Sequence, residues 1–342
     1  MKKIFRYLLI FICIFFVIPA ICTKSKSAIE VNQNNQYYEN VEQNKAINDQ
    51  KNETSKHNYT RFGKINLFHN KTGEIEEIPI DEYLYGTVSA EMPVNYEEEA
   101  IKAQAIVSRT YTIYQISKNK DKHGKADICD DFNCCQAWIS RDERMKRWDE
   151  NKREENWNKI VNAVNSTAGK VITYNGEVIN AFFHSNSGGK TELVSNVWGG
   201  RNYPYIQSVE TSGENEYDQF NSEVVISKNE LIEKIKEKYP DVLIDFNVKD
   251  CIKILDYTES GRVKNIKFGN INLAGTEVRK ILGLKSTNFN FKIEGENIIF
   301  SVIGYGHGVG MSQTGANSMA KEGYLCEEII KHFYANVQIE SW

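Results

Sequence analysis

The N-terminus carries the feature that most restricts the fold, a continuous apolar run from Tyr7 to Cys22. A helix needs about 20 apolar residues to cross a bilayer, whereas a signal-peptide core needs about 10–14. The run lies between these lengths, and no clean small-residue cleavage pattern follows it. We therefore favour an uncleaved anchor over 1–22 rather than a cleaved signal. Because Lys2, Lys3 and Arg6 precede the run, the N-terminus is expected in the cytoplasm and the remainder outside.

Residues 23–60 are polar and have no amphipathic period, which predicts a disordered linker. The folded part is expected over 61–342. The formal net charge of −4 does not suit a nucleic-acid-binding protein, which usually carries a strongly basic surface. The sequence therefore predicts a single-pass protein of the cell membrane whose folded region is extracytoplasmic and contacts no nucleic acid.

Sequence patterns in the folded part predict a mixed α+β fold with two lobes, in which helices surround short antiparallel sheets. A helix is expected over about 97–117, with Ala103 and Val107 on its inner face. Asn175-Gly176 predicts a hairpin between strands 171–174 and 178–183. Residues 205–295 are expected to form a second lobe, after which the chain returns through 298–303.

Three of the seven cysteines cluster at Cys129, Cys134 and Cys135, and His123 precedes them. Three thiolates and one imidazole match a closed tetrahedral zinc site, which would be structural because it has no open coordination position. The spacing is unusual. An extracytoplasmic chain could instead form a disulfide and leave one free thiol, or keep three unlinked thiols. We favour zinc.

Glu91 lies among apolar neighbours, including Val88 and Met92. A desolvated carboxyl group has a raised pKa, which suits a general acid, although a glutamate near a proline is more often a solvated loop residue. His184 follows a predicted strand, and His307 lies in a glycine cluster where backbone can approach a ligand. These histidines suggest a cleft, and tight backbone packing at turns is the alternative.

Five segments occur in a characteristic order. Ser89–Pro93 precede Glu99–Tyr111, and these are followed by Phe183–Gly189, Val197–Gly200 and Gly304–Ala316. Together they resemble the stage II sporulation protein D family, which also includes amidase enhancers, over about residues 61–342. The resemblance implies a lytic transglycosylase that cleaves the β-1,4 bond between N-acetylmuramic acid and N-acetylglucosamine. It implies a preference for denuded glycan strands and a role in engulfment during sporulation, together with a partner amidase and a membrane scaffold.

The family's catalytic glutamate corresponds to Glu91. Ordinary glycosidases need two carboxyl groups, but a lytic transglycosylase uses the 6-hydroxyl of the sugar as its nucleophile. One residue can then serve as acid and afterwards as base, and the product carries a 1,6-anhydro end. Candidates for sugar binding are Lys102, Gln104, Arg109, His184, Ser185, His307 and Gln313.

Clostridial members of the family hold zinc with two histidines and two cysteines. His123, Cys129 and Cys135 match that pattern, and Cys134 stands where the second histidine is expected. Two other functions compete with the enzyme. One is a non-catalytic glycan-binding amidase enhancer on the same fold. The other is an anchored structural protein with a zinc-stabilised loop, which leaves the glycine-histidine segment unexplained.

Overall fold

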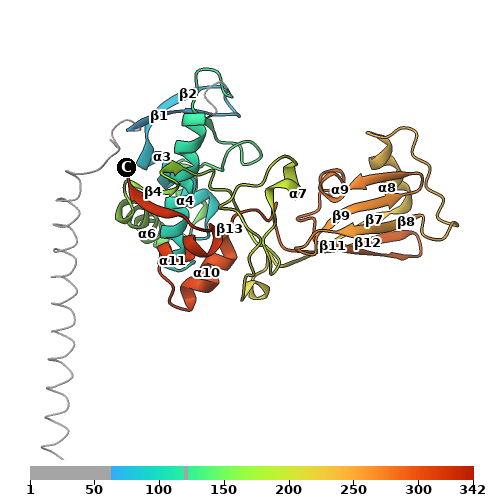
Figure 1. Ribbon diagram of the computed structural model, residues 1–342. Coiled ribbons are helices and arrows are strands. Elements are labelled where there is room, and N and C mark those ends of the chain that lie inside the picture. Colours follow the sequence, from blue (N-terminus) through green and yellow to red (C-terminus); the bar gives the residue numbers. More distant parts are fainter. Residues whose placement is uncertain (1–62, 119–121) are drawn as a thin grey trace, which may run out of the picture. The chain divides into compact units, whose positions relative to one another are not determined.

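The computed structural model describes residues 63–118 and 122–342 (Figure 1). The anchor expected over 1–22 and the linker expected over 23–60 lie outside the described residues. Within the described part, no helix combines the length and the apolar character needed to cross a membrane. Helices and several small sheets occur together, which confirms the α+β class.

The elements up to α7 build most of the first lobe. In chain order these are β1 (Lys64–Phe68), β2 (Ile75–Pro79), α3 (Ile80–Glu91), α4 (Glu98–Lys118), β3 (Ile128–Cys129), α5 (Arg141–Arg147), η3 (Glu150–Lys152), α6 (Arg153–Ser166), β4 (Lys170–Tyr174), β5 (Glu177–Val178), β6 (Phe183–His184) and α7 (Val194–Trp198). The remaining elements are η4 (Glu214–Glu216), β7 (Asn221–Ser227), α8 (Lys228–Lys236), β8 (Ile252–Tyr257), β9 (Val263–Phe268), β10 (Ile271–Ala274), α9 (Gly275–Leu282), β11 (Phe289–Glu294), β12 (Asn297–Ile303), β13 (Met311–Ser312), α10 (Gln313–Lys321), α11 (Cys326–Phe333) and β14 (Gln338–Ser341).

Helix α4 is the centre of the first hydrophobic core. Helices α3, α6, α10 and α11 and strand β4 pack against it (Figure 1). Its residues Ala103, Ala105 and Ile106 are fully buried, and burial extends round the helix instead of along the single face expected from the sequence. A helix that is enclosed in this way needs no amphipathic stripe. Its small side chains let the neighbouring helices approach closely.

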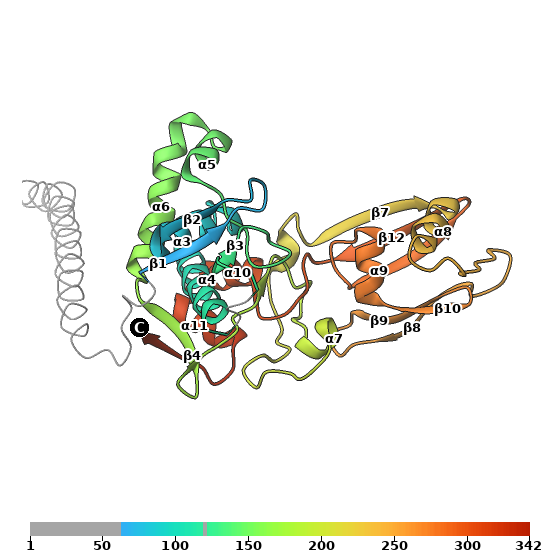
Figure 2. The same cartoon turned by 90° about the horizontal axis from the view of Figure 1, so that it is seen from above.

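The elements from β7 to β12 in chain order form a second hydrophobic core, with core residues from Ile226 to Val302, and this core defines the second lobe. Strands β11, β12 and β7 form one antiparallel sheet, and β10, β9 and β8 form another. Helices α8 and α9 pack on these strands (Figure 2). The second lobe was expected over 205–295. Its core also includes residues of β12, whereas Tyr205 and Ile206 are buried in the first core.

The expected hairpin forms, but its second strand is short. Asn175 and Gly176 both have positive φ, 53° and 78°, as a two-residue turn of this kind requires. Only Glu177–Val178 pair with β4 as β5. The chain then leaves the hairpin: the amide of Asn180 donates to the Tyr205 hydroxyl at 3.0 Å. Strand β6 pairs in parallel with β13, which brings two distant loops together.

Glu214, which is buried, holds these loops in place. Its Oε1 accepts hydrogen bonds from the Ser187 amide at 3.0 Å, the Thr314 hydroxyl at 2.9 Å and the Ser312 hydroxyl. Burial raises the pKa of this carboxyl, but the hydrogen bonds outweigh burial and lower the pKa below its usual value. An ionised Glu214 therefore joins the segment after β6 to the start of α10.

Arg262 links the second lobe to the first. Its fully buried guanidinium donates to the carbonyl oxygens of Ser187 at 2.6 Å and Lys190 at 2.8 Å. Nearby, Glu192 Oε2 accepts from the hydroxyls of Thr258 and Ser260, both at 2.6 Å. A loop of the first lobe and a turn of the second lobe are thus held together by hydrogen bonds.

Candidate active site

Glu91 is the last residue of α3, and its side chain is half-buried. The helix ends here because Pro93 forces the preceding Met92 into an extended conformation, with φ −108° and ψ 132°. The carboxyl group therefore lies at the negative end of the helix dipole, which disfavours its ionised form. Its position results from the sequence Glu-Met-Pro.

Two hydrogen bonds hold the Glu91 carboxyl. The backbone amide of Ala137 donates to Oε1 at 2.7 Å, and Gln313 Nε2 donates to Oε2 at 3.4 Å. Burial raises the pKa of Glu91 to about 7, and the two hydrogen bonds oppose that rise. A carboxyl with this pKa is present in both protonation states at neutral pH, so it can give a proton and take one back.

The orientation of the Gln313 amide is fixed by α4. Gln104 Nε2 donates to the Ser108 hydroxyl at 2.9 Å, so Gln104 presents its oxygen to Gln313. That oxygen accepts from Gln313 Nε2 at 3.4 Å. Because Gln313 must turn its nitrogen toward this oxygen, the same nitrogen also faces Glu91. The structure thus brings two expected site residues, Gln104 and Gln313, to the candidate acid.

A short loop after the cysteine cluster supplies the other donor to Glu91. Gln136, which is buried, anchors this loop by donating to the Tyr83 hydroxyl at 2.9 Å and the Thr112 hydroxyl at 2.8 Å. The next residue, Ala137, then directs its amide toward Glu91. Sequence reasoning missed Ala137 because a backbone donor leaves no signal in residue type.

The four expected metal ligands converge on this loop. The ligand atoms of His123, Cys129, Cys134 and Cys135 all lie within 4.8 Å of one another. His123 Nε2 is 3.2 Å from the sulfur of Cys135 and 3.9 Å from that of Cys134. A tetrahedral zinc site with sulfur ligands has edges of about 3.8 Å. The arrangement therefore fits a four-coordinate metal ion.

The three thiols are free in the structure. The hydrogen bond between the two thiols lowers the pKa of Cys129 and raises that of Cys135. A thiolate is the form that binds a metal. Strand pairing fixes Cys129, because β3 runs parallel to β1 and places this residue opposite Phe68.

His184 and His307 lie together, with ring centroids 5.6 Å apart. His184 Nδ1 donates to the Val309 carbonyl oxygen at 3.1 Å, whereas His307 Nδ1 accepts from the Val309 amide at 3.1 Å. Burial lowers the pKa of His184 to about 3 and also lowers that of His307. Both rings are therefore neutral at physiological pH and offer hydrogen bonds rather than charge.

Lys102 and Ser185 make contacts away from the Glu91 carboxyl. Lys102 pairs with Glu98 at 2.6 Å and Glu99 at 2.9 Å on its own helix. The backbone carbonyl of Ser185 accepts from the Thr314 amide at 3.0 Å. The second contact positions the first turn of α10, which carries Gln313.

Arg109 is fully enclosed. Its guanidinium donates to the carbonyl oxygens of Thr167 at 2.8 Å and Val164 at 3.2 Å, at the end of α6. Backbone carbonyls at a helix end lack partners within the helix, so a buried arginine there satisfies several of them. The geometry gives Arg109 a structural role that sequence spacing could not reveal.

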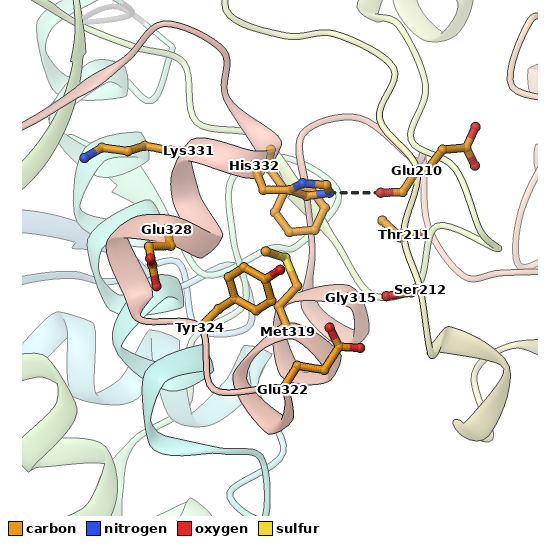
Figure 3. Close-up of a pocket in the computed structure, with 11 residues that line it drawn as sticks. Glu210, Thr211, Ser212, Gly315, Met319, Glu322, Tyr324, Glu328, Lys331 and His332 are labelled. Atoms are coloured by element: carbon orange, nitrogen blue, oxygen red, sulfur yellow. Dashed lines mark hydrogen bonds between the residues drawn. The ribbon is translucent and has the colours of Figure 1, made fainter.

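A separate cavity of about 440 Å³ lies beside α10 (Figure 3). Gly315 and Met319 line it, roughly 200° and 240° round the helix from Gln313 at 100° per residue. On its other side, His332 Nε2 donates to the Glu210 carbonyl oxygen at 2.9 Å. Helix α10 thus presents one face to Glu91 and another to this cavity.

Known proteins resemble this chain over most of its length. Residues 68–174 match the family described as SpoIID, Stage II sporulation protein. Stage II sporulation protein D of Bacillus subtilis (strain 168) is 34% identical over 276 residues, covering 80% of this chain and 78% of that protein. Stage II sporulation protein D of Bacillus amyloliquefaciens is 32% identical over 277 residues, with coverage of 80% and 78%.

A more distant similarity joins the chain to the amidase enhancer of Bacillus subtilis (strain 168), which is 25% identical over 311 residues. The match covers 76% of this chain and 40% of that protein. The two stage II sporulation proteins match a larger share of their own lengths and at higher identity. On these similarities, the chain belongs to the stage II sporulation protein D family.

Proposed function

We propose that this protein is a peptidoglycan lytic transglycosylase, which cleaves the β-1,4 bond between N-acetylmuramic acid and N-acetylglucosamine in denuded strands. The observation that carries the proposal is the Glu91 carboxyl, whose pKa burial raises to about 7. Among the residues that the structure describes, its hydrogen-bond partners are Ala137 and Gln313, and no second carboxyl group is bonded to it. One carboxyl group is sufficient when the sugar supplies the nucleophile.

The reaction proceeds in two proton transfers. Protonated Glu91 gives its proton to the glycosidic oxygen while the bond from that oxygen to C1 of the muramic acid breaks. The 6-hydroxyl of the same sugar attacks C1, and the ionised Glu91 takes the hydroxyl proton. The products are a 1,6-anhydromuramic end and a free 4-hydroxyl on N-acetylglucosamine. No water is consumed, and the enzyme ends in its starting state.

The surroundings of Glu91 support both roles. Burial favours the protonated acid before the first transfer. The Ala137 amide and the Gln313 amide favour the carboxylate that exists between the two transfers. Because Gln104 fixes the orientation of Gln313, the second donor is available without a side-chain flip.

The metal ion that fits the cysteine cluster is, in this proposal, structural zinc held by His123, Cys129, Cys134 and Cys135. Four protein ligands leave no position for substrate or water. When bound, zinc would supply a cross-link between the segment before β3 and the loop that leads to Ala137. The cluster also motivates the assignment of a clostridial type within the family.

The proposed setting is engulfment during sporulation. An N-terminal anchor would hold the protein in the mother-cell membrane with residues 61–342 on the extracytoplasmic side. Its partners would be peptidoglycan strands, a sporulation amidase that removes stem peptides, and a membrane scaffold of the engulfment complex. The names of the stage II sporulation proteins that resemble this chain support that setting.

The experiment is product analysis by mass spectrometry after incubation of the full-length protein with denuded glycan strands. We expect 1,6-anhydromuramic ends with the unaltered chain and none with Glu91→Gln. Glu82→Gln, on the exposed side of the same helix, is the matched control and should retain activity. Anhydro ends from Glu91→Gln at the unaltered rate would overturn the assignment.

A second function remains a candidate because of the match to an amidase enhancer. A non-catalytic protein would bind strands and stimulate an added amidase, yet yield no anhydro ends from any substrate. Measuring amidase turnover in the presence of the unaltered chain and Glu91→Gln separates the two functions. Stimulation by both proteins without anhydro products supports the enhancer.

A further inference from the structure

Two large aromatic side chains are exposed near the histidine pair. Trp198 ends α7 and is 51% exposed, and its ring centroid lies 4.9 Å from that of His307. Tyr305 is 43% exposed and precedes His307 by two residues. Exposed aromatic side chains beside a candidate site often mark a binding surface, because a ligand that covers them removes apolar area from water, which is favourable.

Two cations of the second lobe lie beside the same surface. Lys285 Nζ is 5.2 Å from the centroid of the Tyr305 ring, and the Lys285 carbonyl oxygen accepts from the Gly306 amide at 2.9 Å. Arg279 interacts electrostatically with Tyr305, His184 and His307. Its Nε donates to the Leu284 carbonyl oxygen at 3.3 Å.

Within residues 63–118 and 122–342, no ion pair joins Arg279 or Lys285 to a carboxylate, whereas other lysines of the second lobe are paired, such as Lys228 with Glu296 and Lys238 with Glu277. Arg262 differs from the two cations, since its guanidinium donates to two carbonyl oxygens and to the Ser260 hydroxyl. Arg279 is partly buried, and burial lowers its pKa. A partly desolvated guanidinium without a carboxylate is a strong site for one, because its planar fork matches the two oxygens.

We propose that Arg279 and Lys285 bind the free lactyl carboxylate of a muramic acid residue, while Trp198 and Tyr305 contact the sugar rings. The inference rests on the proposed function and names the chemical group that its substrate must carry. In peptidoglycan this carboxylate exists only where no stem peptide is attached, because the peptide is joined to it as an amide. Denuded strands would thus be selected by attraction between their carboxylates and the two cations, in addition to the absence of a bulky stem peptide.

The two sites are close enough to bind one strand. His307 and Gln313 are six residues apart in the sequence, so their backbones lie at most about 22 Å apart even in a fully extended chain. Gln313 contacts Glu91 directly. A strand of a few sugars is therefore long enough to reach from the candidate acid to the histidine pair beside the carboxylate site.

The test uses two forms of the same strands. One is denuded and keeps its lactyl carboxylates; the other is coupled to methylamine, which removes the charge and adds little bulk. Binding is measured by pull-down and titration calorimetry with the full-length chain carrying Glu91→Gln, so that turnover does not intervene. We expect about tenfold tighter binding to the charged strands at low salt, and a smaller preference at high salt.

Variants identify the residues that recognise the carboxylate. Adding Arg279→Gln and Lys285→Gln should abolish the preference, and Arg279→Lys should partly keep it. Lys264→Gln with Lys280→Gln removes the same charge from exposed positions of the second lobe and should leave the preference intact.

Equal binding of both strand forms overturns the carboxylate site, while anhydro products from the unaltered chain would still uphold the transglycosylase. A preference that survives Arg279→Gln and Lys285→Gln also overturns it. Failure to bind either strand form, together with absent anhydro products, overturns both proposals.

Discussion

Burial and hydrogen bonding act in opposite directions on the Glu91 carboxyl. In the unfolded chain its pKa is about 4.5, and in the folded protein it is about 7. Below pH 4.5 the group is protonated in both states and does not affect stability. As pH rises toward 7, the unfolded chain loses this proton while the folded protein keeps it, so folding becomes less favourable.

Glu91→Gln should therefore stabilise the protein at pH 8, by up to about 3 kcal/mol, and the gain should vanish near pH 4. Urea unfolding of the variant and the unaltered chain at several pH values measures this difference. Glu82→Gln serves as the control and should show no such pH dependence. A gain that is constant from pH 4 to pH 8 would contradict the raised pKa.

Gln313→Leu removes a hydrogen bond that favours the carboxylate. The pKa of Glu91 should rise further, so the alkaline limb of the pH–rate profile should move up by about half to one pH unit. The maximal rate should fall about tenfold, because the carboxylate formed after the first proton transfer loses a donor. An unchanged or acid-shifted limb would show that Gln313 does not act on Glu91.

At the scale of elements, the cysteine-rich loop connects a metal site to the candidate acid. Cys135 is followed directly by Gln136, which is anchored to Tyr83, and then by Ala137, whose amide reaches Glu91. The loop is polar and has few apolar side chains to bury, so a metal ion would supply the cross-link that packing does not.

Cys129→Ser should lower the zinc content from one ion per chain and reduce Tm by about 5–10 °C. Metal analysis and calorimetry of the full-length protein provide the measurements. Cys251→Ser replaces a buried cysteine outside the cluster, and this variant should keep the same zinc content as the unaltered chain. A zinc-free unaltered chain with the same Tm before and after chelation would exclude a structural metal.

At the scale of the whole molecule, the contact between the two lobes includes a close approach of the Gly308 backbone to the Arg262 side chain. Gly308 has φ +83°, and a Cβ atom there would lie 2.6 Å from Nη2 of Arg262, a guanidinium that is itself fully buried. The glycine is therefore required both by its backbone conformation and by the space that the arginine occupies.

Gly308→Ala should destabilise the protein by about 3 kcal/mol, whereas Gly261→Ala should cost about 1 kcal/mol. Gly261 is the matched control, since its φ is +80° and nothing lies within 4 Å of its Cβ position. The difference in urea unfolding isolates the contact with Arg262. Equal losses in the two variants would mean that the arginine moves aside freely.

The features that depend on local sequence patterns were predictable from the sequence. Helix α4, the Asn-Gly turn and the convergence of His123 with the cysteines all follow from residue type and spacing. The pairing of β6 with β13 was not predictable, because a parallel pair between residues 183 and 311 depends on the whole fold between them. The burial of Arg109 and the Ala137 donor were missed for a related reason: both depend on backbone groups, which every residue shares.

The contact between Glu91 and Gln313 spans 222 residues of chain. Synthesis runs from the N-terminus to the C-terminus, so α3 is complete long before its partner on α10 has been made. A ribosome that stops early releases a chain with the acid but without the amide that prepares it. The candidate site is therefore complete only after α10 has been synthesised and its first turn has reached the end of α3.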